Sequence, residues 1–173
     1  MDKNEEIRSE FRETVDSYPQ HKLYYVDECG IDKYLYREYG WSPRGEKIYT
    51  TISGRKSKRV GIVAAQIAKD IVAPLQYDGA MDSVLFETWF EQRLLPSLPE
   101  KTVIVMDNAT FHRKRKLIPL ATCKGHEIIF LPPYSPELNL IENFWSWLKR
   151  RLKKVISQFD SLDHAISDSF NLI

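Results

Sequence analysis

Residues 131–154, LPPYSPELNLIENFWSWLKRRLKK, decide how the rest of the chain can be interpreted. Pro132, Pro133 and Pro136 fix their own φ angles and push the preceding residues towards extended backbone, so the segment begins as a rigid turn. Ser135 followed by Pro136 is typical of a helix N-cap with proline in the first helical position. The apolar side chains that follow recur every three or four residues, which predicts an amphipathic helix. They are Leu138, Ile141, Trp145, Leu148 and Leu152.

Glu142 is the unusual residue of this expected helix. At 100° per residue it falls about 60° from Trp145 and about 40° from Leu138, at the edge of the apolar stripe. A carboxylate there needs a hydrogen-bond donor, a cation or a metal ion. Lys149 and Lys153 lie within about 20° of Glu142, two and three turns further on. An acid that holds a metal, followed by lysines that hold phosphates, requires this layout, but an ordinary amphipathic helix with charged flanks explains it equally well.

Length and composition place the chain among single-domain globular proteins. It has 173 residues and a formal net charge of +1. No apolar run is long enough for a transmembrane helix, and the polar N-terminus is not a signal peptide, so we expect no membrane partner. Cys29 and Cys123 belong to no CxxC pair, which argues against structural zinc and favours a reducing, cytoplasmic setting.

Three clusters of basic residues stand out in this nearly neutral chain. They are Arg55, Lys56, Lys58 and Arg59; Arg113, Lys114, Arg115 and Lys116; and Lys149, Arg150, Arg151, Lys153 and Lys154. Charge runs are usually solvated surface. Three of them together nevertheless indicate a polyanionic partner, because phosphate contacts are electrostatic and local.

The first half of the chain predicts a helix over 4–16 and then a meander of strands. The expected strands cover residues 23–28, 33–39, 47–52, 59–67 and 71–77. The short connections between them imply antiparallel hairpins. Asp27 closes the first strand just before Cys29 and Gly30. An acid at the end of a central strand is a common place for metal chemistry, although for Asp27 alone a turn-initiating aspartate is the simpler interpretation.

The second half alternates helices and strands. We expect a helix from Asp82 to about Pro96, a helix beginning near Arg113, and a C-terminal helix from Ser161 or Asp163, with strands at 101–107 and 127–131. Strands separated by crossover helices run parallel, so the late strands should be parallel to the first. The order predicts an α/β fold with a mixed sheet.

This topology brings three carboxylates together. Asp27 and Asp107 would lie at the same end of neighbouring parallel strands, where ligands bind in such sheets. Glu142 would arrive from a helix packed over that edge. Carboxylates at this density repel one another unless a cation intervenes, and oxygen ligands alone select Mg²⁺ or Mn²⁺.

Three blocks in this order resemble the DDE catalytic domain of mariner-type transposases and their bacterial insertion-sequence relatives. The blocks are 26–28 (VDE), 106–109 (MDNA) with His112, and 133–139 (PYSPELN) with Ile141, Glu142 and Trp145, and the turn 40–45 (GWSPRG) also fits. Asp107 and Glu142 are 35 positions apart, close to the spacing in that family. One departure is Leu140, where relatives often have proline.

The resemblance implies a ribonuclease-H-like α/β fold: a mixed five-stranded sheet, an antiparallel meander followed by parallel strands, flanked by helices. It implies that Asp27, Asp107 and Glu142 are the catalytic triad and hold two Mg²⁺ ions, for which Mn²⁺ can substitute. Asn108 and His112 would shape the site around Asp107. The implied activity is cut-and-paste transposition on double-stranded DNA, acting on both element ends and target. The basic residues Arg55 to Arg59, Arg113 to Lys116, Lys149 and Lys153 would then hold DNA phosphates.

Residues 1–21 form only a lead-in to the expected catalytic domain at 22–173, too short for the helix-turn-helix modules that begin most family members. We expect that such a part is encoded separately or that the chain is a truncated remnant. The resemblance also implies that the working form of a relative is at least a dimer, because two element ends must be brought together, which makes a homodimer a candidate for this chain. Two other functions remain open: a nuclease that cuts without joining, and a catalytically silent DNA-binding or regulatory remnant. An acid-base hydrolase acting on a substrate other than phosphate is the weakest alternative.

Overall fold

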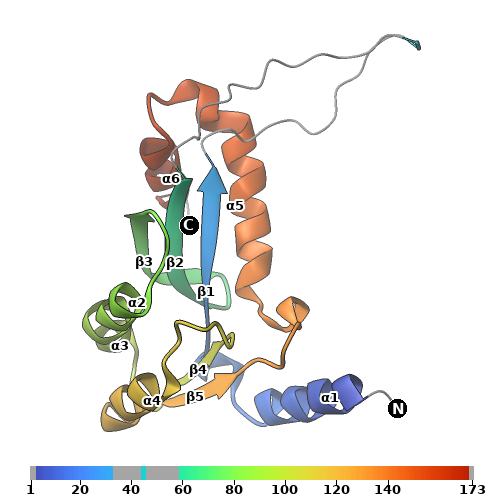
Figure 1. Ribbon diagram of the computed structural model, residues 1–173, viewed down its shortest axis with the longest axis vertical. Helices are drawn as coiled ribbons and strands as arrows, with labels where there is room; N and C mark the ends of the chain where they lie inside the picture. The colour runs from blue at the N-terminus through green and yellow to red at the C-terminus, as the bar shows by residue number, and fades with distance from the viewer. Residues whose placement is uncertain (1–2, 33–43, 46–58, 172–173) are drawn as a thin grey trace.

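The computed structural model describes residues 3–32, 44–45 and 59–171. The elements in chain order are α1 (Lys3–Asp16), η1 (Gln20–Lys22), β1 (Leu23–Asp32), β2 (Arg59–Ile67), β3 (Asp70–Asp78), α2 (Ser83–Trp89), η2 (Phe90–Leu94), α3 (Leu95–Ser97), β4 (Val103–Met106), α4 (Lys114–Cys123), β5 (Glu127–Phe130), η3 (Pro136–Leu138), α5 (Ile141–Val155), η4 (Ile156–Gln158) and α6 (Leu162–Phe170) (Figure 1). The strands predicted at 33–39 and 47–52 lie outside the described residues, as do Arg55, Lys56 and Lys58.

The five strands form one mixed sheet in the order β3-β2-β1-β4-β5. The first three strands pair antiparallel, whereas β4 and β5 run parallel to β1. The connection from β3 to β4 passes through α2, η2 and α3, and the connection from β4 to β5 passes through α4. The predicted α/β fold with an antiparallel meander followed by parallel strands is therefore confirmed.

Strand β1 is longer than the sequence suggests. It was expected to close at Asp27, but it continues to Asp32 and pairs with β2 as far as the Asp32–Arg59 pair. Gly30 does not end the strand. Instead, a Cβ atom at this position would lie 2.0 Å from the guanidinium of Arg59, so glycine permits the close approach of that side chain. Asp27 consequently lies within the strand.

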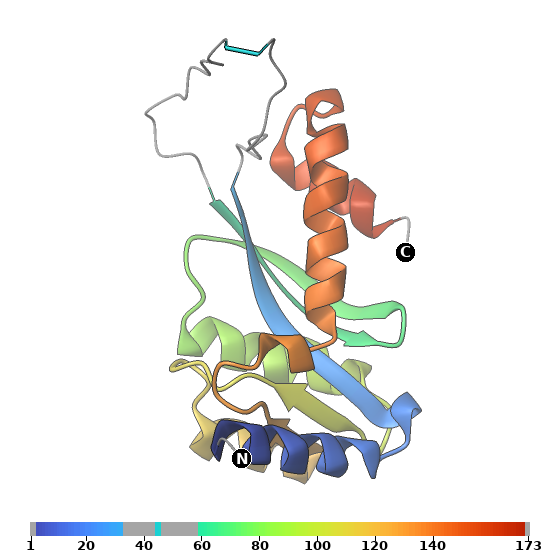
Figure 2. The same ribbon diagram turned by 90° about the vertical axis from the view of Figure 1, so that its right-hand side faces the viewer.

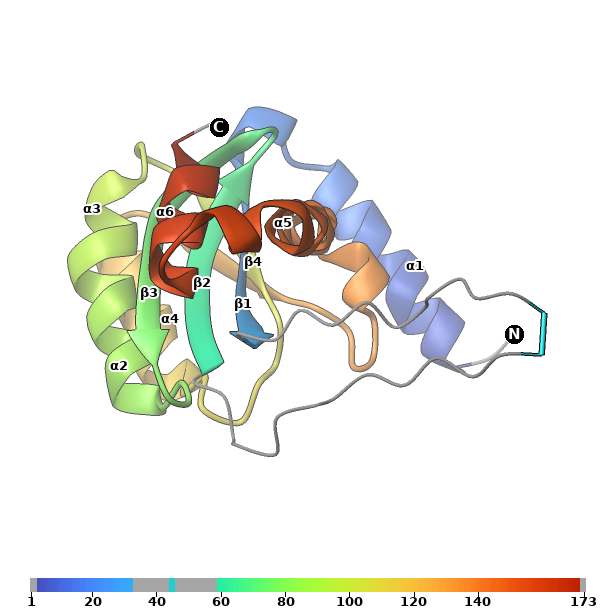
Figure 3. The same ribbon diagram turned by 90° about the horizontal axis from the view of Figure 1, so that it is seen from above.

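Helices cover both faces of the sheet (Figure 3). Alternate side chains of β1 point to opposite faces. Tyr25 and Cys29 pack in a core with α1, α5 and α6. Tyr24 and Val26 pack in a second core with α2, η2, α3 and α4. By this alternation the Asp27 side chain faces the layer that contains α5. The adjacent Glu28 side chain faces the layer on the opposite side of the sheet.

Helix α5 begins at Ile141, and the expected start at Ser135 is wrong. The Ser135-Pro136 pair instead opens η3, a single turn of 3₁₀ helix. Asn139 then adopts extended backbone, and its buried Nδ2 donates a hydrogen bond to the Val26 carbonyl oxygen of β1 at 3.3 Å. This contact between distant segments interrupts the helix that local sequence favours. Among the described helices none is long and apolar enough to cross a membrane.

Candidate active site

The fold places three acidic side chains around one open cleft. Val26 of β1 lies opposite Met106 of β4 in parallel register, so Asp27, which lies within β1, is beside Asp107, which directly follows β4. Glu142 stands in the first turn of α5. All three line a cleft of about 430 Å³, together with Asn108, Asn139 and the 131–136 loop. The structure thus brings together the acids predicted from sequence.

The surroundings of Asp27 disfavour the ionised form of its carboxyl group. Burial raises its pKa to about 8, and the nearby charges of Glu28, Glu142 and Asp107 add to the effect. Trp145 of α5 donates a hydrogen bond from Nε1 to Asp27 Oδ2 at 3.1 Å and so fixes the orientation of the carboxyl group. Because the ionised form is unfavourable here, a nearby cation would stabilise it strongly.

His112 connects Asp107 to the opposite side of the sheet. Its side chain is fully buried, with Nδ1 3.0 Å from Asp107 Oδ1 and Nε2 3.1 Å from Glu28 Oε1. Burial works to lower the pKa of His112, but the hydrogen bonds to Asp107 and Glu28 outweigh it and raise the pKa to about 9. His112 is therefore a cation at neutral pH, with both ring nitrogens donating.

The contact with His112 also affects whether the Asp107 carboxyl group is ionised. Burial acts to raise the pKa of Asp107, whereas the hydrogen bonds from His112 and from the Ala109 backbone N–H lower it, and the net shift is downward. The Ala109 N–H lies 3.0 Å from Asp107 Oδ1. Asp107 is consequently held ionised and in one orientation at the wall of the cleft, as a metal ligand requires.

The donor set of the cleft fits a hard divalent cation. Within the described ranges no three acidic, histidine or cysteine side chains are gathered closely enough to hold a metal without rearrangement. The lining nevertheless offers carboxylate oxygens on three elements, the ligands that Mg²⁺ and Mn²⁺ prefer. In addition, the buried Oδ1 of Asn139 has no hydrogen-bond partner among the described residues, although it lines the same cleft. That orphaned acceptor suits a water of a hydrated ion.

The basic residues predicted to hold phosphates are in three different situations. Lys149 and Lys153 are exposed on α5. Burial raises the pKa of the Cys29 thiol, the charges of Asp27 and Glu142 raise it further, and Lys149 lowers it. Lys149 is therefore close to the same thiol as the two acids, which places it beside the acidic cleft. Arg59 lines a different cleft, with Glu28 and Tyr77.

The run Arg113 to Lys116 is partly committed to contacts within the protein. Arg113 donates to both carboxylate oxygens of Glu87, with Nη2 2.6 Å from Oε2, and Lys116 Nζ lies 3.4 Å from the same carboxylate. Lys114 Nζ lies 4.2 Å from the centre of the Phe130 ring. Arg115 is exposed. Arg113 and Lys116 therefore share one carboxylate, so the group keeps one net positive charge, and Arg113 makes the closer contact with Glu87.

The sequence patterns alone indicate no role in the site for Glu28, Trp145 or Asn139. Glu28 follows Asp27 directly, and the alternation of a strand could have placed it on the far face, but nothing local indicates that His112 reaches it. The spacing of Trp145 predicts a place in the apolar stripe, whereas the contact of its indole N–H with Asp27 depends on how α5 packs over β1. Asn139 belongs to the quoted motif, and its contact with Val26 depends on the fold.

Several solved structures share this fold. A solved Mos1 transposase paired-end complex with the left transposon end has a TM-score of 0.75 at 14% identity, covering 99% of this chain and 55% of that chain. The Mos1 mariner paired-end complex with Mn gives a TM-score of 0.69 at 15% identity, covering 99% and 56%. The Mos1 strand transfer complex gives 0.70 at 14%, covering 97% and 51%.

This chain thus spans about half the length of those solved chains. No curated protein matches it. The family model described as DDE superfamily endonuclease matches residues 22–164, a span that contains all three acids of the cleft. The chain therefore belongs to the DDE superfamily of endonucleases.

Proposed function

We propose that this chain is the catalytic domain of a transposase, which cuts DNA with divalent metal ions and joins the cut end to target DNA. The observation that carries the proposal is the convergence of Asp27, Asp107 and Glu142 from two parallel strands and a helix onto one cleft. The similar Mos1 structures include paired-end and strand transfer complexes, which supports the transposase assignment and a working form of at least two copies.

In the proposed reaction, Asp27, Asp107 and Glu142 would hold two divalent ions, Mg²⁺ or Mn²⁺. Bound there, the ions would activate a water or a DNA 3′-hydroxyl and neutralise charge on the leaving oxygen at phosphorus. His112 keeps Asp107 ionised and oriented, and Trp145 orients Asp27. Asn139 Oδ1 is available to accept a hydrogen bond from a water in the cleft. Asn108 lines the same cleft beside Asp107.

A joining assay tests this function and separates it from simple hydrolysis. The chain is incubated with Mn²⁺, a supercoiled plasmid and a labelled duplex with a free 3′-hydroxyl. We expect nicked plasmid and label joined to plasmid, with neither product in EDTA. Nicking without joining would make the chain a nuclease and contradict strand transfer. Absence of both products would contradict the proposed function as a whole.

The lysines of α5 should dominate the salt dependence of DNA binding. Each phosphate contact changes the slope of log K against log salt by about 0.9, so Lys149→Ala or Lys153→Ala should make that slope shallower by about one. Arg113→Ala is the matched control, because the Arg113 guanidinium is already engaged by both carboxylate oxygens of Glu87. Duplex affinities measured at several salt concentrations provide the comparison. A change for Arg113→Ala as large as for Lys149→Ala would contradict this division of roles.

A further inference from the structure

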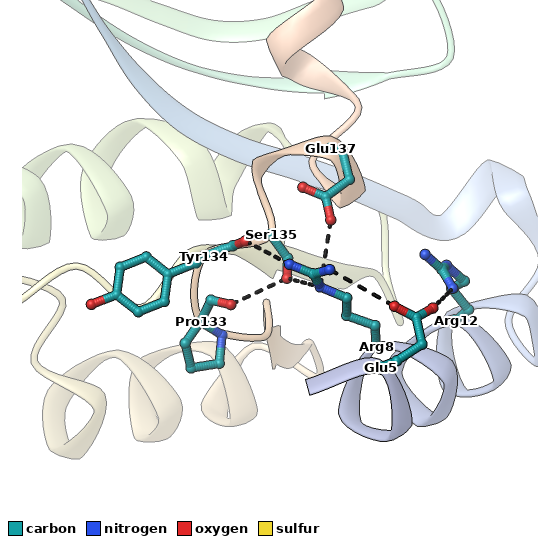
Figure 4. Close-up of polar contacts among 7 residues, drawn as sticks. All are labelled: Glu5, Arg8, Arg12, Pro133, Tyr134, Ser135 and Glu137. Atoms are coloured by element: carbon teal, nitrogen blue, oxygen red, sulfur yellow. Dashed lines mark hydrogen bonds and ion pairs between the residues drawn. The ribbon is translucent and has the colours of Figure 1, made fainter. Parts of the chain in front are cut away.

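Helix α1 is fastened to the loop that forms one wall of the cleft. Arg8 donates from Nε to Ser135 Oγ and from Nη2 to the Tyr134 carbonyl oxygen, each at 3.0 Å. Ser135 Oγ in turn donates to the Pro133 carbonyl oxygen at 3.2 Å. Figure 4 shows this group of contacts, and Figure 2 shows the segment between β5 and α5 passing close to α1. One arginine thus braces consecutive residues of the loop against the N-terminal helix.

Arg8 is itself held in place from both sides. Its guanidinium lies 3.8 Å from Glu5 of α1 and 3.6 Å from Glu137 of η3. Exposed ion pairs of this kind contribute little to stability individually. Their geometric effect is larger, because the guanidinium is planar and its donors point in fixed directions. The arrangement therefore fixes the shape of the loop more than it stabilises the fold.

Tyr134 is the loop residue whose backbone carbonyl Arg8 holds. Its φ is 53°, in the left-handed region that bulky residues rarely adopt, and its side chain is 94% exposed. Tyr134 also lines the cleft that holds the three acids. Its ring points away from Arg8 and α1 (Figure 4). A strained backbone that carries a large exposed aromatic ring at the mouth of a cleft is typical of a binding contact.

We propose that Tyr134 is a stacking platform for an unpaired nucleobase next to the DNA strand held in the cleft, and that Arg8 is its positioning residue. The inference rests on the proposed function, since it takes the ligand of the cleft to be DNA. A cleft of about 430 Å³ has the volume of a small-ligand site, so it can accept a single nucleotide. Enzymes that act within a duplex commonly move bases out of the stack.

The chemistry of the rim favours a base over a phosphate at this point. The cleft beside Tyr134 is lined by Asp27, Asp107 and Glu142, so an anion gains nothing from approaching it without a cation. A neutral aromatic face attracts any base, because every base has a π face, and such stacking tolerates sequence differences. Phosphates remain the ligands of the metal and of the lysines on α5.

The test uses the full chain and a DNA duplex with a short single-stranded overhang that contains 2-aminopurine. Binding is measured in Ca²⁺, an oxygen-binding cation that stands in for Mg²⁺ in the cleft. The unaltered chain should quench the fluorescence. Tyr134→Ala and Tyr134→Leu should abolish quenching and weaken binding about tenfold, whereas Tyr134→Phe should keep both. Unchanged quenching in Tyr134→Ala would overturn the proposal. Loss of quenching in Tyr134→Phe would also overturn it, because the contact would then depend on the hydroxyl group and not on stacking.

The positioning role of Arg8 has a matched control in Arg12. Both arginines project from α1 and pair with Glu5, but only Arg8 contacts the loop. Arg8→Ala should reduce quenching as Tyr134→Ala does, and Arg12→Ala should leave it unchanged. Equal quenching in the two variants, at matched thermal stability, would overturn the role of Arg8.

Nicking of plasmid in Mn²⁺, measured in parallel, separates the inference from the proposed function. If the unaltered chain nicks the plasmid but Tyr134→Ala quenches the fluorescence as well as the unaltered chain does, the stacking contact alone is overturned. Quenching that depends on Tyr134 without nicking would keep the stacking contact and overturn cleavage. If the unaltered chain does not bind the overhang, the inference fails, and the nicking result then decides the proposed function by itself.

Discussion

In EDTA, Asp27→Asn should make the protein more stable while abolishing its nicking activity in Mn²⁺. The folded protein buries Asp27 beside Glu28, Glu142 and Asp107, which raises its pKa from the ordinary 3.8 to about 8. Asparagine is neutral in both the folded and the unfolded state, so it avoids the cost of protonating this carboxyl group on folding, and it still offers an oxygen to Trp145 Nε1. We expect a gain of about 1–2 kcal/mol in the free energy of unfolding at neutral pH, and a thermal midpoint higher by several degrees.

The effect should depend on pH in a defined direction. Because the folded-state pKa of Asp27 lies above the unfolded value, the carboxyl group lowers stability progressively as pH rises from about 4 to about 8. The advantage of Asp27→Asn should therefore grow across that window. Asp32→Asn, at the exposed end of the same strand, is the control and should show no such trend. A variant no more stable than the unaltered protein at pH 8 would contradict the account.

His112→Ala should have the second large effect, on both stability and catalysis. The substitution leaves Asp107 and Glu28 without their shared buried cation and removes a ring packed 4.1 Å from the Phe86 ring centre. Breaking a buried charge pair in this way costs about 3–5 kcal/mol. Loss of a group that orients a metal ligand typically lowers activity by about 10–100-fold. Thermal unfolding and nicking rates at saturating Mn²⁺ measure the two effects.

His126→Ala provides the matched comparison for His112→Ala. His126 is also buried, but its Nδ1 accepts from the Thr102 backbone N–H at 3.4 Å, before β4 begins. Its replacement should lower stability without lowering the nicking rate per folded molecule. If His112→Ala likewise lost stability alone, with an unchanged nicking rate and metal requirement, His112 would be structural and would have no role in orienting Asp107.

Much of the fold could be predicted because the spacing of apolar residues along the sequence indicates which face of a strand or helix is buried. The alternation of β1, the apolar strand before Asp107 and the stripe of α5 each depend on local sequence, and the structure confirms their placement. The helix starts predicted at Asp82, and at Ser161 or Asp163, also agree with the structure, in which Asp82 and Ser161 each cap a helix by accepting from a backbone N–H three residues on. With connections that must cross the sheet, these elements permit few topologies. The juxtaposition of Asp27 and Asp107 followed from that topology.

The remaining features depend on contacts between distant segments. Helix α5 starts late because Asn139 bonds to β1, and β1 is long because β2 pairs along it. The link from His112 to Glu28 crosses the sheet, and the pairing of Arg113 with Glu87 joins α4 to α2. The brace from Arg8 to the loop spans 126 positions of the chain. No local propensity encodes such contacts, so they required the structure.

The most direct test of the central claim is Mn²⁺-dependent nicking of a plasmid by the purified chain beside its Glu142→Gln variant. Glu91→Gln, which makes the same change at an exposed position on η2, serves as the control. We predict that the unaltered chain and Glu91→Gln nick the plasmid at the same rate and that Glu142→Gln does not nick it. Equal nicking by Glu142→Gln would contradict the assignment of Asp27, Asp107 and Glu142 as the metal-binding triad.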